Sequence, residues 1–123
     1  MKVAKVNEMI IRDFFKLGLT PELLGFKYLR EAVLMVLDEP KTLHNGITKI
    51  IYPEIAKRNN TTASRVEKAM RYAIECTFLK KDAKVLEDYF GGTFDAEKGK
   101  LTNGAFIAVV AEHIRIQIQK GGK

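Results

Sequence analysis

Residues Tyr52–Glu75 read YPEIAKRNNTTASRVEKAMRYAIE, and this stretch decides the fold of the chain. It contains Ala56, Asn60 and Val66 in order, four and then six residues apart. A helix-turn-helix requires a small residue where its second helix crosses the first, and Asn or Gly where the turn adopts a left-handed backbone. It also requires an apolar residue that pins the second helix. The stretch therefore predicts a helix-turn-helix.

The two helices of this motif are expected over residues 53–58 and about 62–79, with Thr62 as the cap of the second. At about 100° per residue, the second helix has an apolar arc and a polar arc. The apolar arc comprises Val66, Ala69, Met70, Ala73, Cys76 and Thr77. The polar arc comprises Ser64, Arg65, Glu67, Lys68, Arg71, Tyr72 and Glu75. In such motifs the second helix enters the DNA major groove, so the polar arc is the expected reading surface.

The positive charge of the chain is concentrated in the same region. Residues 1–40 hold six basic and six acidic side chains, and residues 82–123 hold the same numbers. Residues 41–81 hold nine basic and three acidic side chains, which accounts for the whole net charge of +6. A concentrated positive field attracts polyanions, above all nucleic acid. The competing interpretation is a charge that serves solubility alone.

Apolar residues recur at helical spacing along most of the remaining chain, which predicts one all-α domain over residues 1–123 with about six helices. Gly18 is the expected end of the first helix, and Thr20 and Pro21 are the expected cap and first residue of the next. That helix should stop before Pro40. Further expected segments are a helix over 42–51 interrupted by Tyr52 and Pro53, a helix over 84–90, a loop over 92–104, and a helix over 104–119 capped by Thr102. The expected core includes Phe14, Phe15, Phe26, Phe90 and Phe106.

Several classes of protein are disfavoured by the sequence. No apolar run approaches the roughly 18 residues of a membrane span, and the N-terminus has no signal-peptide pattern. The single cysteine, Cys76, is expected to be a buried hydrophobe and cannot form an internal disulfide, so we expect a cytoplasmic protein. His44 and His113 lack partners at metal-ligand spacing. No nucleophile, base and orienting acid occur together, so we expect no enzyme, no cofactor, no metal and no small-molecule substrate.

Three segments resemble a known family: GFKYLREAVLMV, GITKIIYPEIAKRNNTTASRVEKAMRYAIE and LTNGAFIAVVAEHIRIQ. They are similar, in this order, to the C-terminal effector domain of the response regulator that initiates sporulation in endospore-forming bacteria. The resemblance covers roughly residues 5–118. It implies a six-helix domain that binds double-stranded DNA through a helix-turn-helix. It also implies a short promoter box containing TGTCGAA, often bound by tandem copies.

By position, the resemblance implies that Arg65, Glu67 and Lys68 contact bases. The chemistry agrees, because arginine can donate two hydrogen bonds to guanine and glutamate can accept one from cytosine. The expected contacts to the DNA backbone are Thr62, Ser64, Arg71, Tyr72, Lys57, Arg58 and Lys81. Glu67 and Arg71 are also spaced to pair along the helix, which is compatible with contacting DNA. The chain departs from the family where Lys68 replaces a usual Arg, Tyr72 a usual His and Leu101 a usual Pro.

Regulators of this family carry a phosphoacceptor receiver domain before the effector domain, and these 123 residues contain none. Both an excised domain and a natural stand-alone protein fit this observation. Two functions are therefore compared: a sequence-specific DNA-binding regulator, and a receiver-less interaction module that pairs with a full-length regulator and modulates it. A helix that retains Arg65, Glu67 and Arg71 favours the first.

Overall fold

The computed structural model describes residues 3–93 and 101–121, and in this part of the chain every regular element is helical. The α-helices are α1 (Val3–Lys16), α2 (Leu24–Asp38), α3 (Lys41–His44), α4 (Tyr52–Arg58), α5 (Ala63–Lys80), α6 (Ala83–Phe90) and α7 (Asn103–Gln119). A π-helical turn, Ile47–Ile51, precedes α4, and a 3₁₀ turn, Gly91–Thr93, follows α6. The all-α prediction is confirmed. Most of the predicted loop over 92–104 lies outside the described residues.

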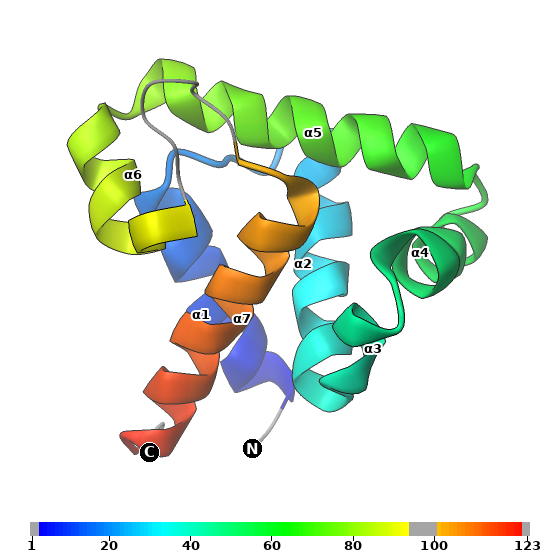
Figure 1. Ribbon diagram of the computed structural model, residues 1–123, viewed down its shortest axis with the longest axis horizontal. Coiled ribbons are helices and arrows are strands. Elements are labelled where there is room, and N and C mark those ends of the chain that lie inside the picture. The colour runs from blue at the N-terminus through cyan, green and yellow to red at the C-terminus, as the bar shows by residue number, and fades with distance from the viewer. Residues whose placement is uncertain (1–2, 94–100, 122–123) are drawn as a thin grey trace.

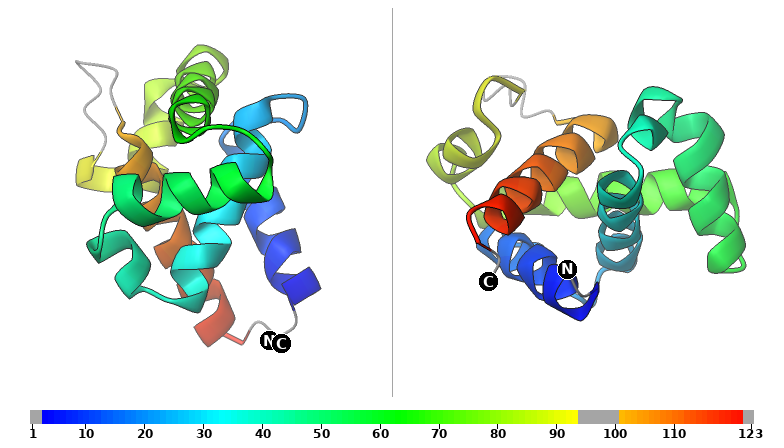
Figure 2. Two further views of the ribbon diagram at one scale, coloured as in Figure 1. Left: turned by 90° about the vertical axis from the view of Figure 1, so that its right-hand side faces the viewer. Right: turned by 90° about the horizontal axis from the view of Figure 1, so that it is seen from below.

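The long helix α5 crosses one side of the molecule, and α1, α2 and α7 run away from it (Figure 1). Seen from below, these three helices lie together while α5 passes behind them (Figure 2, right). The helix α2 packs against α5, α7 and α1 and is therefore the centre of the fold.

Aromatic rings fill the core between α1, α2 and α7. The ring of Phe14 lies 5.2 Å from that of Phe26 and 5.8 Å from that of Phe106, centroid to centroid. Phe90 is buried as well. The expectation for Phe15 was wrong, because its side chain is 51% exposed and only flanks Phe26. Phe15 follows Phe14 directly, and consecutive residues of a helix point about 100° apart, so the two cannot share one buried face.

The end of α1 confirms the role expected of Gly18. This residue has a φ of 79°, the left-handed region that glycine tolerates. Two hydrogen bonds close the helix around it: Leu19 N–H donates to Phe14 C=O at 2.9 Å, and Gly18 N–H donates to Phe15 C=O at 3.0 Å. This pair of bonds defines a Schellman motif.

The start of α2 differs from the prediction. The helix begins at Leu24, and Leu23 precedes it without a side-chain cap. Thr20 and Pro21 lie in a turn, where the Thr20 hydroxyl donates to the Glu22 carboxylate at 2.7 Å instead of capping a helix. Lys80 Nζ at the end of α5 also donates to the Thr20 hydroxyl, at 3.2 Å. This contact spans 60 residues of sequence, so local capping rules could not predict it.

The segment before α4 also breaks in a different place. The interruption is at Gly46, with a φ of 118°, and the π-helical turn then runs directly into α4. Tyr52 N–H donates to Ile47 C=O, five residues back. A proline ring crowds the carbonyl four residues before it, and we attribute the wider turn to Pro53, which lies in the first turn of α4 as expected.

Candidate nucleic-acid interface

The turn between α4 and α5 has the backbone geometry that the sequence predicts. Asn60 has a φ of 53°, and it is the only residue other than glycine with a positive φ in the described part of the chain. Thr61 N–H donates to Ala56 C=O at 2.9 Å, and Asn60 N–H donates to Lys57 C=O at 3.4 Å. These bonds form a second Schellman motif, with Asn60 in the place that Gly18 occupies after α1. Ala56 and Val66 are buried, so the predicted helix-turn-helix is confirmed.

Thr62 begins α5 as predicted. Its backbone is extended, and its hydroxyl oxygen accepts a hydrogen bond from Arg65 N–H at 3.2 Å. Such a cap satisfies one of the unpaired N–H groups in the first turn of a helix. The residues that follow, Ser64 and Arg65, are exposed. The cap therefore fixes where α5 begins, directly before the expected reading surface.

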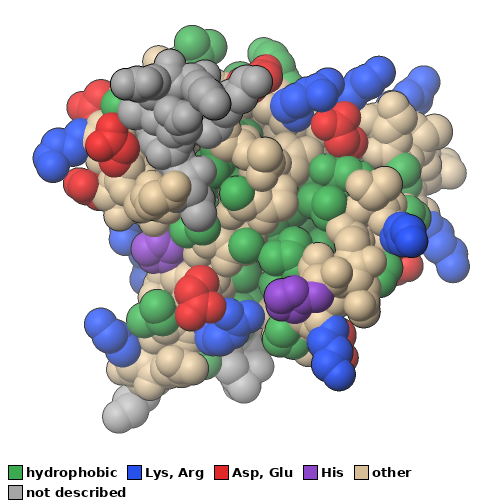
Figure 3. Space-filling view, viewed as in Figure 1, with side chains coloured by type: hydrophobic (Ala, Val, Ile, Leu, Met, Phe, Trp, Pro, Cys, Tyr) green, Lys and Arg blue, Asp and Glu red, His purple; other side chains and the backbone are tan. Residues whose placement is uncertain are grey.

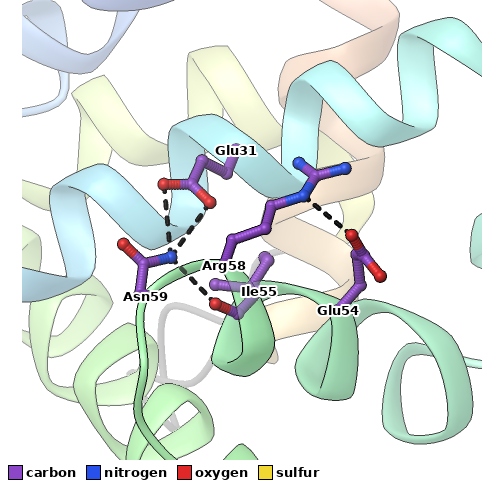
Figure 4. Close-up of polar contacts among 5 residues, drawn as sticks. All are labelled: Glu31, Glu54, Ile55, Arg58 and Asn59. Atoms are coloured by element: carbon purple, nitrogen blue, oxygen red, sulfur yellow. Dashed lines mark hydrogen bonds and ion pairs between the residues drawn. The ribbon is translucent and has the colours of Figure 1, made fainter.

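A polar contact ties this turn to the body of the domain (Figure 4). Asn59 Nδ2 donates to the Glu31 carboxylate on α2, at 3.1 Å to its nearer oxygen, and to Ile55 C=O at 2.8 Å. Beside it, Arg58 Nε donates to the Glu54 carboxylate at 2.9 Å. The amide of Asn59 thus both completes the end of α4 and holds it against α2.

The distance between α5 and α2 is set by a glycine. A Cβ atom added to Gly25 would lie 2.3 Å from the Ala69 carbonyl oxygen and 2.7 Å from the Ala73 Cβ. Both are closer than atoms can approach without a shift of the backbone, so only glycine allows this crossing. The inner face of α5 therefore rests directly on the N-terminal part of α2.

The predicted base-contacting residues on the outer face of α5 differ in their exposure and in their pairing. Arg65 and Lys68 are exposed, and neither forms an ion pair within the described residues. Glu67 is half-buried, and Arg71 Nη1 lies 3.2 Å from its carboxylate. At about 100° per residue, Arg65 and Lys68 are about 60° apart around the helix, whereas Glu67 is about 160° from Arg65. The three residues therefore occupy the two edges of the exposed face.

The predicted backbone-contacting residues are spread more widely. Ser64, Arg71 and Tyr72 are exposed on α5, and Lys57 is exposed on α4. Blue Lys and Arg side chains gather at the upper right of Figure 3, over α4 and the first half of α5. Arg58 is also exposed, but it lines a hollow with residues of α1, α2 and α7. Lys81 follows the far end of α5, about 24 Å along the helix axis from Arg65 at 1.5 Å per residue.

Sequence reasoning missed the residue that joins both helices of the motif. Asn103, the first residue of α7, is 8% exposed. Its Nδ2 donates to Tyr52 Oη on α4 at 2.9 Å and to Glu67 C=O on α5 at 3.2 Å. Burial raises the pKa of the Tyr52 phenol above its ordinary value, so this hydroxyl is neutral near neutral pH. The cap of α7 gave no indication of this contact, because the partners lie 51 and 36 residues away in the sequence.

An open cavity of about 480 Å³ lies beside these residues, between α5 and the start of α7. Its lining includes Tyr52, Glu67, Arg71 and Asn103, so it borders one edge of the expected reading surface. No group of three or more His, Cys, Asp or Glu side chains among the described residues could hold a metal ion. None of the described helices combines the length and apolar character required to cross a bilayer.

A comparison with protein families agrees with this geometry. Residues 10–114 match the family model described as "Sporulation initiation factor Spo0A C terminal". This span includes α2 to α6, the second half of α1 and most of α7. The family is a DNA-binding regulatory domain and not an enzyme family. The chain therefore belongs to the Spo0A C-terminal family of DNA-binding domains, which act in the regulation of transcription and sporulation.

Proposed function

We propose that the domain binds double-stranded DNA sequence-specifically, with the first half of α5 in the major groove of a TGTCGAA-like box. One observation carries this proposal. Arg65 and Lys68 extend from the helix that follows the left-handed turn at Asn60, and no carboxylate in the described residues pairs with either. Cations that the protein leaves unpaired are available for guanine edges and phosphates.

The proposed roles follow from the position of each side chain. Arg65 donates to O6 and N7 of a guanine, and Lys68 donates to a neighbouring base as a point charge without the planar fork of arginine. Glu67 accepts from a cytosine amino group, oriented by its pairing with Arg71.

The remaining residues are proposed to grip the DNA backbone. They are Thr62, Ser64, Arg71 and Tyr72 on or beside α5, Lys57 and Arg58 on α4, and Lys81 beyond α5. Exposure supports this role best for Lys57, at the end of α4, and for Arg71, in the first half of α5. We further propose that copies of the domain bind in tandem on adjoining boxes, and that the protein acts in the cytoplasm.

The test is a fluorescence-anisotropy titration with a TGTCGAA duplex and a scrambled duplex at several salt concentrations. The cognate duplex should bind about a hundredfold more tightly or better, since each mismatched pair costs roughly 1–3 kcal/mol. If about four phosphates are engaged, log affinity should fall with log salt at a slope of about −4. Equal affinity for both duplexes would contradict sequence-specific binding and favour the interaction module that modulates a full-length regulator.

A further inference from the structure

The side chain of Asn103 connects three helices, because it extends from α7 and forms hydrogen bonds to both helices of the helix-turn-helix. Its amide extends from α7 and donates one hydrogen bond to α4, at Tyr52, and one to α5, at Glu67. We infer that Asn103 is a positioning residue that sets the angle of α5 relative to α4, and thereby the sequence discrimination of the domain. This inference rests on the proposed function, because discrimination requires that α5 reads DNA.

The apolar contacts between the two helices do not fix this angle by themselves. Ile55, Val66 and Met70 are fully buried, but hydrophobic burial is non-directional and tolerates small rotations. The close crossing at Gly25 fixes the separation of α5 from α2 near Ala69 and Ala73. Hydrogen bonds weaken steeply when their angles change, so polar contacts supply the missing directional restraint.

The location of the contact suits this role. Tyr52 begins α4, and Asn59, which Glu31 holds on α2, follows its end. The helix α4 is thus held by polar contacts at both ends. On α5 the contact is at Glu67, two residues after Arg65 and one before Lys68. A reading side chain must be held within about 0.5 Å and 10–20° of its productive geometry, so a small pivot of α5 is sufficient to misplace it.

Asn103 is itself held firmly. Its backbone begins α7, where the Thr102 hydroxyl accepts from Ala105 N–H at 3.1 Å. The amide nitrogen has two hydrogen atoms, and the two acceptors on α4 and α5 account for both. Because Asn103 is also buried, it has no room to adopt another orientation without leaving polar groups unpaired.

The test compares Asn103→Ala with a matched control, Asn7→Ala. Asn7 also donates a side-chain hydrogen bond, to Val3 C=O at 3.2 Å, but lies on α1 away from the motif. At a temperature where all variants are folded, Asn103→Ala should lower the ratio of cognate to scrambled affinity about fivefold to tenfold, the effect of one or two hydrogen bonds. Affinity for the scrambled duplex should change less than about twofold. Asn7→Ala should leave the ratio unchanged.

Amide hydrogen exchange of the free protein supplies a measurement independent of DNA. Asn103→Ala should accelerate exchange in α4 and the first half of α5 relative to α1, and Asn7→Ala should not. Tyr52→Phe keeps the ring and removes one acceptor, so it should lower the affinity ratio by less. Adding it to Asn103→Ala should cause no further loss, because the two changes remove the same bond.

The two proposals fail in different ways. A wild-type protein that binds both duplexes equally would overturn the proposed function. Unchanged exchange in α4 and α5 on Asn103→Ala would overturn the positioning role. If the wild type distinguishes the two duplexes, an Asn103→Ala variant that loses thermal stability but keeps the wild-type affinity ratio would overturn it as well.

Discussion

In one polar region of the described part of this domain the charged groups are exposed and unpaired, and in another they are buried and bonded to one another. Comparing the two shows what distinguishes a binding surface from a structural cluster. Around α5, Arg65 and Lys68 are exposed and unpaired within the described residues. Between α1, α6 and α7, Asp13 is only 2% exposed, and it accepts from Tyr89 Oη at 2.7 Å and from Gln117 Nε2 at 3.2 Å. His113 stacks on the Tyr89 ring at 3.8 Å between centroids.

By residue type alone, the second region would attract more attention. A carboxylate, a phenol and an imidazole are the groups that proton-transfer sites use. In this structure, however, they bond to one another: His113 Nε2 lies 2.8 Å from the Tyr89 carbonyl oxygen, and the Tyr89 hydroxyl donates to Asp13. Buried polar groups satisfied in this way stabilise a fold. On the outer face of α5, by contrast, the donors of Arg65 and Lys68 are exposed and available to an external partner.

The largest predicted effect concerns Gly25, where α2 crosses α5 closely. Gly25→Ala should destabilise the domain by about 3 kcal/mol, because the new methyl group would collide with the Ala69 carbonyl oxygen and displace α5. Gly104→Ala in α7 is the control, since no atom of the described residues lies within 4 Å of the added atom and alanine favours a helix. Urea denaturation measures both. Equal stability of the two variants would show that α5 does not depend on this crossing.

The comparison predicts that an unpaired cation on the outer face of α5 matters for DNA binding and not for folding. Arg65→Ala should cost roughly 1–3 kcal/mol on the cognate duplex and much less on the scrambled one. The free energy of unfolding should stay within about 0.5 kcal/mol of the wild type. Arg12→Ala, an exposed change on α1, is the control and should leave both affinities unaltered. If Arg65→Ala weakens both duplexes equally, Arg65 contacts a phosphate.

The internal cluster should show the reverse behaviour. Tyr89→Phe removes the hydrogen bond to Asp13 and should cost about 1–2 kcal/mol of stability at neutral pH, with DNA discrimination unchanged. Burial, then the bond to Asp13 and its charge, raise the pKa of Tyr89 far above the ordinary value of 10.0. Above about pH 10 the unfolded chain therefore releases this proton first, and the stability of the wild type falls as pH rises. Denaturation curves from pH 8 to 11 should show a shallower decline for Tyr89→Phe.

The smallest predicted effect concerns the far end of α5. Lys81→Ala should weaken cognate and scrambled DNA alike, by about twofold to threefold, and reduce the salt slope by about one unit. Lys81 lies about 24 Å along the axis from Arg65, so it can touch only backbone if it touches the same duplex. A salt slope identical to that of the wild type would remove Lys81 from the interface.

The predictions that the structure confirmed rest on local physics. Asn60 and Gly18 end helices because each tolerates a left-handed backbone, and both can be recognised from a few neighbouring residues. Thr62 and Thr102 cap the helices that follow them, as their positions predict. The roles of individual side chains on DNA remain predictions, because the sequence indicates which face of α5 is polar and not which atom meets which base.

Features determined by distant contacts could not be derived from the sequence in this way. From its neighbours in the sequence Gly25 is an ordinary helix-weakening glycine, and only the fold brings Ala69 of α5, more than 40 residues later, against it. Gln117 reaches Asp13 across 104 residues. Asn103 has the local pattern of a residue after a helix cap, and only the packed fold gives it acceptors on α4 and α5.

The arrangement of the ends of the fold has a practical consequence for engineering. The first residue of α1 and the last of α7 lie on the side of the molecule opposite α5 (Figure 1). A tether joining two copies in one chain would therefore not have to cross the proposed DNA-facing side. For two adjoining boxes, such a tether would make the second binding event intramolecular, with an effective concentration set by linker length. Affinity for paired boxes could then be tuned by spacing alone, with every residue of α5 left unaltered.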